Sequence, residues 1–470
     1  MKFTRPALAL AASVLASAAC SSTDPELPGG TAGTPGTAGT PGGGAPAAGA
    51  PAGGSAPVAG AAGSVATGGA GSSAGGNAAA GTATGGAATA GGGSGGTGGS
   101  AGAAGGSVGG SGGSGGSGGG SGGVSSNTEG PCDIYQKGGN ACVAAYSTIR
   151  RLLSTYTGPL YQVRTGSNAM NTGSGGMTVD IPQNAAGFAD ISKQTAACAN
   201  TYCTVSKLYD QSGKGNDITV AKAGLTNGGQ YAGMDDFETT IGRSDTKDKI
   251  KVGGHDVYTL YMEARQGYRQ TKVGNGMAIG DDPQGIYMLA DGTRTGTACC
   301  WDFGNVTTNP KSYAEMNTLF FGVAFWGRGE GNGPWFGADF EAGVWMGGSK
   351  PGEPGWGGLN DAKNAPPNPK NPSLKVKYAL GFQKTQPGPE RYALRMADAA
   401  TATALTTAYA GAYPQGKHLD AKGAVVLGVG GDNSNNAWST FYEGAIVQGY
   451  PPDASEDAIL QNIKALRYGQ

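Results

Sequence analysis

The feature that most constrains this chain is a long stretch with almost nothing from which to build a core. No charged residue occurs from Leu27 to Thr128, and no aromatic residue occurs between Phe3 and Tyr135. The chain has 92 glycines among 470 residues, and most of this excess lies in the same stretch. Such a segment cannot bury enough apolar surface to offset the entropy lost on folding. We therefore predict a disordered Gly/Ser/Ala-rich linker over residues 20–128.

The first residues have the pattern of an export signal. A short basic start precedes an apolar stretch that is too brief to span a membrane, so residues 1–19 are predicted to be a signal peptide. Ser17-Ala-Ala-Cys20 is close to a lipoprotein cleavage site, although Ser17 replaces the usual Leu. We favour lipidation of Cys20 over ordinary cleavage. This predicts an extracellular or cell-surface protein of bacterial type, which contacts a membrane only through its anchor.

Residues 129–470 are long enough for one large domain or two small ones. They contain short alternating runs that are separated by loops of Gly, Asn and Pro, which is typical of a β-sandwich or jelly roll with a few short helices. The net charge of −1 gives no support to nucleic-acid binding or to a basic membrane-binding patch.

Hydrophobic spacing places the individual elements. Helices are predicted over Cys142–Tyr156 and Ala185–Ala197, and a capping box at Asp453-Ala-Ser-Glu456 is predicted to open a final helix. Strands are predicted over Thr204–Tyr209, Val257–Glu263, Gly285–Leu289, Leu319–Phe325, Trp335–Glu341, Val376–Phe382, Tyr392–Met396, Ala424–Val429 and Thr440–Val447.

Two carboxylates lie two residues apart in one of these strands. Asp339 and Glu341 would share a face of the sheet, because residues i and i+2 of a strand point to the same side. Trp335 and Trp345 would flank them on that face. Acids of tuned pKa beside flat apolar surfaces are what glycoside hydrolysis requires. The alternative is a polar strand edge that faces solvent.

A third acid lies in a polar loop. Asp432 follows the predicted strand Ala424–Val429, and such a loop can carry an acid into a cleft above a sheet. The alternative is an Asx-turn that only shapes the loop. The nearby Glu443 is interpreted as structural. With only His255 and His418 available, a Ser-His-Asp triad and a zinc site are disfavoured, and no metal or other cofactor is expected.

The seven cysteines fit an exported protein. Cys20 is the odd one, and it matches a modified N-terminus. The other six are expected to form disulfides, and proximity favours Cys132–Cys142 and Cys198–Cys203. For the adjacent Cys299 and Cys300, a strained mutual bond, two free thiols and a different pairing remain alternatives.

Several motifs occur in the order found in one known family. They are Pro131-Cys-Asp-Ile-Tyr135, Gly158-Pro-Leu-Tyr-Gln-Val-Arg164, Tyr209-Asp-Gln-Ser-Gly213, Cys299-Cys300 with Asp302 and Gly304-Asn305, Gly333-Pro-Trp335, Gly428-Val-Gly-Gly-Asp-Asn-Ser-Asn435, Phe441-Tyr-Glu-Gly444 and Gly449-Tyr-Pro451. Through them, residues 131 to about 468 resemble the catalytic domain of the α-L-arabinofuranosidase B enzymes, glycoside hydrolase family 54.

The resemblance implies a concanavalin-like β-sandwich that removes terminal non-reducing α-L-arabinofuranosyl residues from L-arabinan or arabinoxylan with retention. It implies Glu341 as the nucleophile and Asp432 as the general acid/base. The other residues that it implies are Asp339, Trp326 and Gly431 around the arabinose, a Cys299–Cys300 disulfide that packs on the sugar, and the bridges Cys132–Cys142 and Cys198–Cys203.

The sequence departs from the family in two places. The family has Asn after the nucleophile, where this chain has Ala342. The fungal members carry a C-terminal arabinose-binding β-trefoil, but this chain ends at Gln470, so we expect weaker binding to polymers or localisation by the lipid tether. The alternatives to a monomeric arabinofuranosidase are a non-catalytic carbohydrate-binding domain on the cell surface and a glycosidase for another furanoside.

Overall fold

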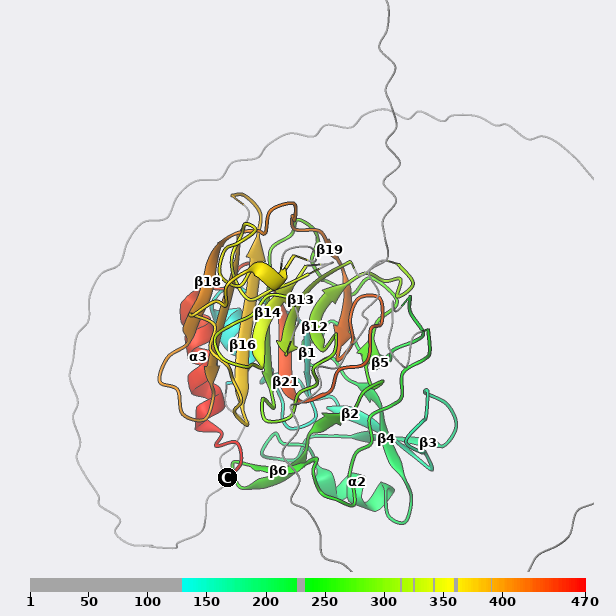
Figure 1. The fold of residues 1–470 in the computed structure, drawn as a ribbon. Coiled ribbons are helices and arrows are strands. Elements are labelled where there is room, and N and C mark those ends of the chain that lie inside the picture. The colour runs from blue at the N-terminus through cyan, green and yellow to red at the C-terminus, as the bar shows by residue number, and fades with distance from the viewer. Residues whose placement is uncertain are drawn as a thin grey trace, which may run out of the picture. The chain divides into compact units, whose positions relative to one another are not determined.

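The structure is a computed structural model that describes residues 129–225, 233–312, 315–323, 326–340, 343–358, 362–389 and 391–470. Within these residues, two antiparallel sheets pack face to face, and two of the helices lie against one of them (Figure 1). No helix in the described residues is long and apolar enough to cross a membrane. The predicted signal peptide, linker and lipidation site at Cys20 lie outside the described residues.

The larger sheet has ten strands among the described residues, and each neighbouring pair is antiparallel. In spatial order the strands are β15 (Val344–Trp345), β14 (Trp335–Asp339), β13 (Met316–Gly322), β12 (Asp302–Val306), β20 (Ala424–Leu427), β9 (Tyr268–Arg269), β5 (Ile218–Val220), β4 (Cys203–Leu208), β2 (Tyr161–Thr165) and β3 (Met177–Ile181).

The smaller sheet has seven described strands, which are also antiparallel. They are β1 (Cys142–Ser147), β21 (Ser439–Gln448), β11 (Gln284–Ala290), β16 (Ala379–Gln386), β17 (Arg391–Asp398), β18 (Thr406–Ala412) and β8 (Leu260–Met262), which pairs with β21. Two further pairs join β6 (Lys249–Val252) to β7 (His255–Tyr258) and β10 (Ile279–Gly280) to β19 (Ala421–Lys422).

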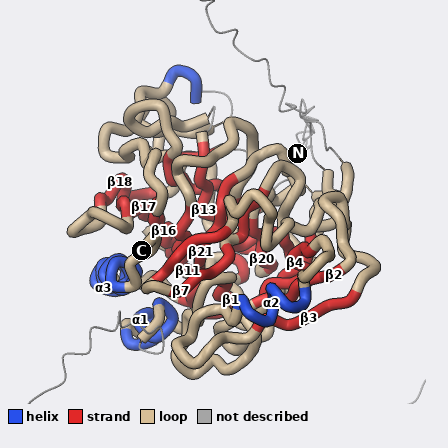
Figure 2. Tube along the Cα trace, turned by 90° about the horizontal axis from the view of Figure 1, so that it is seen from below, coloured by secondary structure: helices blue, strands red, loops and turns tan. Residues whose placement is uncertain are grey.

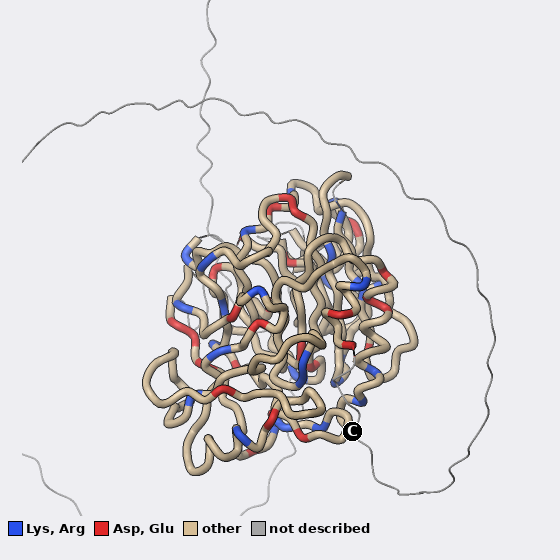
Figure 3. The backbone as a smooth tube through the Cα atoms, turned by 180° about the vertical axis from the view of Figure 1, so that it is seen from behind, with Lys and Arg blue, Asp and Glu red and all other residues tan. Residues whose placement is uncertain are grey.

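The remaining elements are the helices α1 (Pro131–Lys137), α2 (Ile191–Ala197) and α3 (Asp453–Ala465) and the short 3-10 helix η1 (Ala362–Asn364). Figure 2 shows α1 and α3 close together beside the strands of the seven-stranded sheet. Figure 3 shows acidic and basic residues interspersed over the described part of the fold. This mixture fits the near-zero net charge of the chain.

The main core lies between the two sheets. Phe303, Phe336 and Ala338 of the ten-stranded sheet and Met288 of the seven-stranded sheet belong to it. Phe336 stacks on Phe321 with ring centroids 4.3 Å apart. Because side chains alternate along each strand, the intervening residues of the ten-stranded sheet point to its outer face.

A second core covers the outer face of the seven-stranded sheet. It contains Tyr287 and Tyr442 from the strands and Ile459 and Ile463 from α3. The seven-stranded sheet is therefore buried on both faces. Among the described residues, the outer face of the ten-stranded sheet carries no such layer of α-helices, and several of the predicted site residues lie on this face.

The predicted fold class, a mainly β sandwich with a few short helices, is confirmed. The predicted helix over Cys142–Tyr156 is wrong, because residues 142–147 form strand β1. All six residues of β1 are buried, since the seven-stranded sheet is covered on both faces. A strand of this kind lacks alternation, so its apolar residues also fit a helical spacing by chance.

Both other predicted helices exist, with altered starts. α2 begins only at Ile191, where Asp190 caps it by accepting a hydrogen bond from the backbone N–H of Ser192. α3 begins at Asp453, but its N-cap is Pro452 and no side-chain capping bond is present, so the predicted capping box is wrong. The two acids of that motif instead form ion pairs with basic residues of the seven-stranded sheet. Asp453 pairs with Lys384, and Glu456 pairs with Arg395.

All three disulfides of the described residues agree with the pairings that the resemblance implied. They are Cys132–Cys142, Cys198–Cys203 and Cys299–Cys300. The first ties α1 to β1, and the second joins the end of α2 to β4. These bonds are typical of a protein that folds in an oxidising compartment.

The two sheets approach each other closely at Gly381 on β16. A Cβ atom at this position would lie 2.3–2.6 Å from three ring atoms of Phe336 on β14. We expect Gly381→Ala to lower the free energy of unfolding by about 1–3 kcal/mol, the usual cost of overpacking a core. Urea unfolding measures this loss, and Gly381→Ala combined with Phe336→Leu should recover part of it. An unchanged midpoint in the single variant would contradict the close packing.

Candidate active site

The site is built on three adjacent strands of the ten-stranded sheet. On β12, β13 and β14, Thr318 of the middle strand lies opposite Gly304 on one side and opposite Asp339 on the other. Asp302 lies two residues before Gly304, so it shares the face of Thr318 and Asp339. Phe303 and the other residues that alternate with these along the strands point into the core between the sheets. The strand register therefore brings two aspartates from distant parts of the chain together on the outer face.

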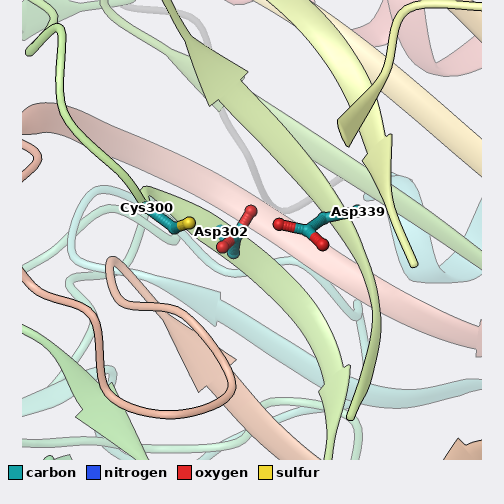
Figure 4. Close-up of side chains that lie close together, drawn as sticks. All are labelled: Cys300, Asp302 and Asp339. Atoms are coloured by element: carbon teal, nitrogen blue, oxygen red, sulfur yellow. The ribbon is translucent and has the colours of Figure 1, made fainter. Parts of the chain in front are cut away.

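Asp302 and Asp339 form a buried carboxylate pair. Figure 4 shows their carboxylates pointing toward each other, with the sulfur of Cys300 beside Asp302. Oxygen atoms of both acids and the Cys300 Sγ all lie within 4.8 Å of one another. Such a cluster can hold a metal, but this sulfur is bonded to Cys299 and cannot act as a thiolate ligand. The arrangement is thus better suited to holding protons and hydroxyl groups.

Asp302 is held in an environment that disfavours its charge. The residue is fully buried, and neither carboxylate oxygen has a hydrogen-bond partner of normal geometry among the described residues. Burial raises the pKa of Asp302 well above its usual value, the negative charges of Asp339 and Asp432 raise it further, and the hydroxyl of Thr318 opposes the shift. Burial and the two neighbouring charges therefore both favour the protonated form of Asp302.

The raised pKa of Asp302 predicts a dependence of stability on pH. Above about pH 3.9, the usual aspartate pKa, the Asp302 carboxyl loses its proton in the unfolded chain but keeps it in the folded protein. The contribution of Asp302 to stability therefore falls as the pH rises above this value. Asp302→Asn removes the titrating group. We expect the melting temperature of this variant, relative to that of the parent, to increase as the pH rises above about 4. A difference that stays constant over this range would contradict the prediction.

Asp432 comes to the same place from a loop. The loop follows β20, and the Gly428 N–H donates to the Asp302 carbonyl at 2.8 Å. The Asp432 side chain accepts a hydrogen bond from the Ser434 N–H at 2.9 Å, so the Asx-turn that the sequence left as an alternative is present. A Cβ atom on Gly430 would lie 3.4 Å from both Asp432 Oδ1 and Cys300 Cβ, which shows that the loop packs against the cysteine pair. The turn therefore shapes the loop and also presents the acid to the carboxylate pair.

Aromatic and sulfur-containing side chains enclose the carboxylates. One apolar cluster on this face contains Trp326, Trp335 and Phe320 together with Cys300, Val344, Met346 and Ala362, and Cys299 packs against it. Trp335 is fixed by a hydrogen bond from its Nε1 to the Glu330 carbonyl at 2.8 Å. Trp326 is 9% exposed. The cluster supplies the flat apolar surface that the sequence predicts beside the acids.

Trp345 does not belong to this surface, so one part of the prediction is wrong. β14 ends at Asp339, and β15 runs back beside it with Trp345 opposite Ala338. Trp345 therefore points into the core, where it packs against Phe340 at a centroid distance of 5.9 Å. The chain reverses between the two strands, and simple alternation does not continue through a reversal. Glu341 lies outside the described residues.

The remaining predicted residues fall in different places. Gly431 is buried in the Asp432 loop, and its carbonyl accepts a hydrogen bond from Arg269 at 2.7 Å. Glu443 is buried on β21 and pairs with Arg150, which supports its interpretation as structural. His255 stacks on Phe188 at a centroid distance of 4.5 Å, as expected of a structural histidine.

Sequence analysis assigned no role to Asp302, Asp236 or Arg269. Asp302 occurs in a motif shared with the family, and this was the only available signal. Asp236 and Arg269 contact the Asp432 loop through the tertiary fold, and no spacing in the sequence links them to it.

A polar cavity of about 260 Å³ lies apart from these acids. Its lining includes Tyr202, Thr240, Arg243 and Asp245, and the last two form an ion pair at 3.0 Å. None of the clustered carboxylates lines this cavity. The chemistry of the carboxylate cluster, rather than the size of this cavity, identifies the candidate site.

Comparison with known proteins assigns the family. The family model described as "Alpha-L-arabinofuranosidase B, catalytic" matches residues 131–469. The chain belongs to this family. The resemblance inferred from the sequence motifs is therefore confirmed, and it covers almost all of the described residues.

Individual members of the α-L-arabinofuranosidase B family show the extent of the similarity. The chain is 40% identical over 345 residues to the alpha-L-arabinofuranosidase of Hypocrea jecorina, and the match covers 72% of this chain and 63% of that protein. It is 39% identical over 345 residues to the "Arabinofuranosidase/B-xylosidase" of Trichoderma koningii, with the same two coverages. The chain thus spans less than two thirds of the length of these curated relatives.

Solved structures of family members have the same fold. An arabinofuranosidase complexed with arabinofuranosyl-alpha-1,2-xylobiose superimposes with a TM-score of 0.63 at 35% identity, covering 72% of this chain and 66% of that one. A family 54 α-L-arabinofuranosidase soaked with a cyclic sulfate inhibitor superimposes with a TM-score of 0.62 at 36% identity and the same coverages. These similarities confirm the predicted sandwich fold.

Proposed function

We propose that this protein is a retaining α-L-arabinofuranosidase that removes terminal non-reducing α-L-arabinofuranosyl residues from polysaccharides such as L-arabinan and arabinoxylan. The observation that carries the proposal is the gathering of Asp302, Asp339 and Asp432 beside the Cys299–Cys300 pair and Trp326. The family, whose relatives are named for this activity, supports the same substrate class.

In the first step, the Glu341 carboxylate attacks the anomeric carbon of the arabinofuranosyl group. The bond from this carbon to the leaving oxygen breaks, and protonated Asp432 delivers its proton to that oxygen. The products are a glycosyl ester on Glu341, a released alcohol and an Asp432 carboxylate. Asp432 faces the cluster from the loop, and Glu341 follows Asp339 by two residues, so the two proposed roles come from different elements.

In the second step, the Asp432 carboxylate removes a proton from water, and the water oxygen attacks the anomeric carbon. The ester bond to Glu341 breaks, and arabinose leaves with its original configuration. Asp339 accepts hydrogen bonds from sugar hydroxyls in this scheme, and the Cys299–Cys300 pair with Trp326 forms the apolar surface against the ring. No step uses a metal or another cofactor.

The direct test is release of p-nitrophenol from 4-nitrophenyl α-L-arabinofuranoside by the full chain, together with release of arabinose from arabinan and arabinoxylan. Turnover of the aryl glycoside by the folded protein supports the proposal. A folded protein that binds arabinan but releases no sugar would be the carbohydrate-binding domain that the sequence left as an alternative.

A second candidate activity is hydrolysis of a different pentoside, because one relative is named an arabinofuranosidase/B-xylosidase. An assay with 4-nitrophenyl β-D-xylopyranoside and with other aryl furanosides separates the two. Faster turnover of one of these substrates than of the arabinofuranoside would replace the first proposal by the second.

We also propose export to the cell surface, with a lipid anchor at Cys20 and a monomeric catalytic domain. The disulfides of the described residues support an oxidising compartment. Incorporation of labelled fatty acid into the parent but not into Cys20→Ser would support the anchor, and equal labelling of both would exclude it. Light scattering of the lipid-free protein measures the oligomeric state.

A further inference from the structure

Two buried side chains from other parts of the fold, Asp236 and Arg269, form hydrogen bonds with the loop that carries Asp432. Asp236 lies in the segment between β5 and β6, and Arg269 is the last residue of β9. Both are buried, with 0% and 3% exposure. Neither residue belongs to the carboxylate cluster, so their contacts with the loop need a separate explanation.

Asp236 accepts hydrogen bonds from two asparagines that follow Asp432 in its loop. Its Oδ1 accepts a hydrogen bond from Asn435 Nδ2 at 2.6 Å and a longer one from Asn433 Nδ2 at 3.4 Å. Asn433 has a φ of +64°, a left-handed conformation that asparagine tolerates better than most residues. One carboxylate oxygen therefore holds the two amides of a loop that turns sharply just after Asp432.

Arg269 holds the other side of the same loop. Its guanidinium donates to the carbonyl of Gly431 at 2.7 Å and to that of Gly430 at 3.4 Å. A second nitrogen donates to the Thr307 carbonyl at 2.6 Å, which ties the loop to the segment after β12. Hydrogen bonds from a charged and buried donor are strong, so the backbone just before Asp432 has little freedom.

The surroundings of Asp236 favour its neutral form. Its Oδ2 has no hydrogen-bond partner among the described residues, and a Cβ on Gly267 would lie 2.6 Å from this oxygen. Burial raises the pKa of Asp236 to about 7; hydrogen bonds from Asn435 and Asn433 and the charge of Arg265 oppose this, while Asp235 adds to it. Below this pH, an asparagine at position 236 would closely mimic the native side chain.

We propose that Asp236 is a positioning residue for the reaction, and that it acts by holding the Asp432 loop in the geometry needed for proton transfer. The inference rests on the proposed role of Asp432 as the general acid. It names no contact between Asp236 and substrate, because the side chain is buried below the loop. Its effect should therefore appear in the step that needs the acid, rather than in binding of the arabinose.

The test uses two substrates that differ in their need for acid catalysis. A 4-nitrophenyl arabinofuranoside has a good leaving group, whereas an alkyl arabinofuranoside needs protonation of the leaving oxygen. In the full chain at about pH 5, we expect Asp236→Ala to lower kcat on the alkyl glycoside by about 10- to 100-fold, with KM nearly unchanged, because small misplacements of reacting groups have effects of this size. The loss on the aryl glycoside should be much smaller, and Asp236→Asn should restore most of the lost rate.

Two further variants separate an effect on the Asp432 loop from general destabilisation of the protein. Asp248 is equally buried, and it accepts backbone hydrogen bonds from Gly242 and Arg243, away from the Asp432 loop. Asp248→Ala thus tests general destabilisation, and it should leave the ratio of the two activities unchanged. If Asp236→Ala does not fold, Asn435→Ala removes the shorter of the two hydrogen bonds from the other side and should change the ratio in the same direction.

The outcomes separate this inference from the proposed function. If Asp432→Asn shows the leaving-group dependence but neither Asp236→Ala nor Asn435→Ala does, the positioning role is wrong and the proposed function stands. The positioning role is also wrong if Asp236→Ala lowers the activities on the alkyl and aryl glycosides equally, because a smaller fraction of folded protein would have that effect. If Asp432→Asn itself lacks the dependence, the assignment of Asp432 as the acid fails first.

Discussion

Glu341→Gln is expected to lower kcat on 4-nitrophenyl α-L-arabinofuranoside by on the order of 10⁴-fold or more, while the protein remains folded. The amide cannot form the glycosyl ester, and loss of a covalent nucleophile has effects of this order. Steady-state release of p-nitrophenol measures the loss, and near-ultraviolet circular dichroism checks the fold. An active Glu341→Gln variant would remove Glu341 from the nucleophile role, for which Asp339 is then the next acid along the strand.

Asp432→Asn provides the complementary result. General acid/base catalysis contributes about 10²- to 10⁴-fold, so the variant should lose this much on substrates with poor leaving groups and less on aryl glycosides. Addition of azide should restore turnover of the aryl glycoside, because azide can attack the ester without help from a base. Asp180→Asn, on the exposed strand β3 outside the cluster, is the control and should retain the parent activity. Equal loss of activity in Asp432→Asn on all leaving groups would contradict the assignment.

The second large effect concerns stability and involves the buried pair of Arg150 and Glu443. Arg150 Nε donates to Glu443 Oε2 at 2.6 Å, and a second guanidinium nitrogen donates to Oε1 at 2.7 Å. Their side chains are 1% and 0% exposed. Burial opposes the charge of Arg150, but the charge of Glu443 and its hydrogen bonds raise the pKa of Arg150 overall.

This pair also joins several parts of the fold. Arg150 donates to Asn462 of α3 at 3.0 Å, and the hydroxyls of Tyr468 and Tyr287 donate to the Glu443 carboxylate. The network therefore links the segment after β1, the strands β11 and β21 and the C-terminal residues. Removal of one member leaves the others buried without partners.

We expect Glu443→Ala to lower the free energy of unfolding by about 3–5 kcal/mol, because it leaves the Arg150 charge uncompensated in the core. Replacing both partners, as Arg150→Met with Glu443→Leu, should cost less than the single change, since no buried charge then remains. Denaturant unfolding measures both. Asp256→Ala breaks the exposed Lys251–Asp256 pair and serves as a control that should change stability little. A single variant as stable as the parent would show that the pair does not hold these segments together.

The candidate site was accessible to sequence analysis only in part. Asp339 and Asp432 were found because each lies beside a recognisable strand or loop pattern, and the structure brings both near Asp302. The predicted place of Trp345 failed because the chain reverses after β14, and a reversal resets the alternation of side chains. β1 was taken for a helix because burial on both faces removes the alternation that identifies a strand.

By itself, the sequence determined the β-rich class, the family and the two local disulfides. Each of these depends on patterns within a few residues or on motifs in a fixed order. Only the tertiary structure decided that Asp302 lies against Asp339, because this proximity depends on the register of β12, β13 and β14. It also decided that Asp236 and Arg269 hold the Asp432 loop. Such contacts join residues far apart in the chain, and local spacing carries no information about which distant strands become neighbours.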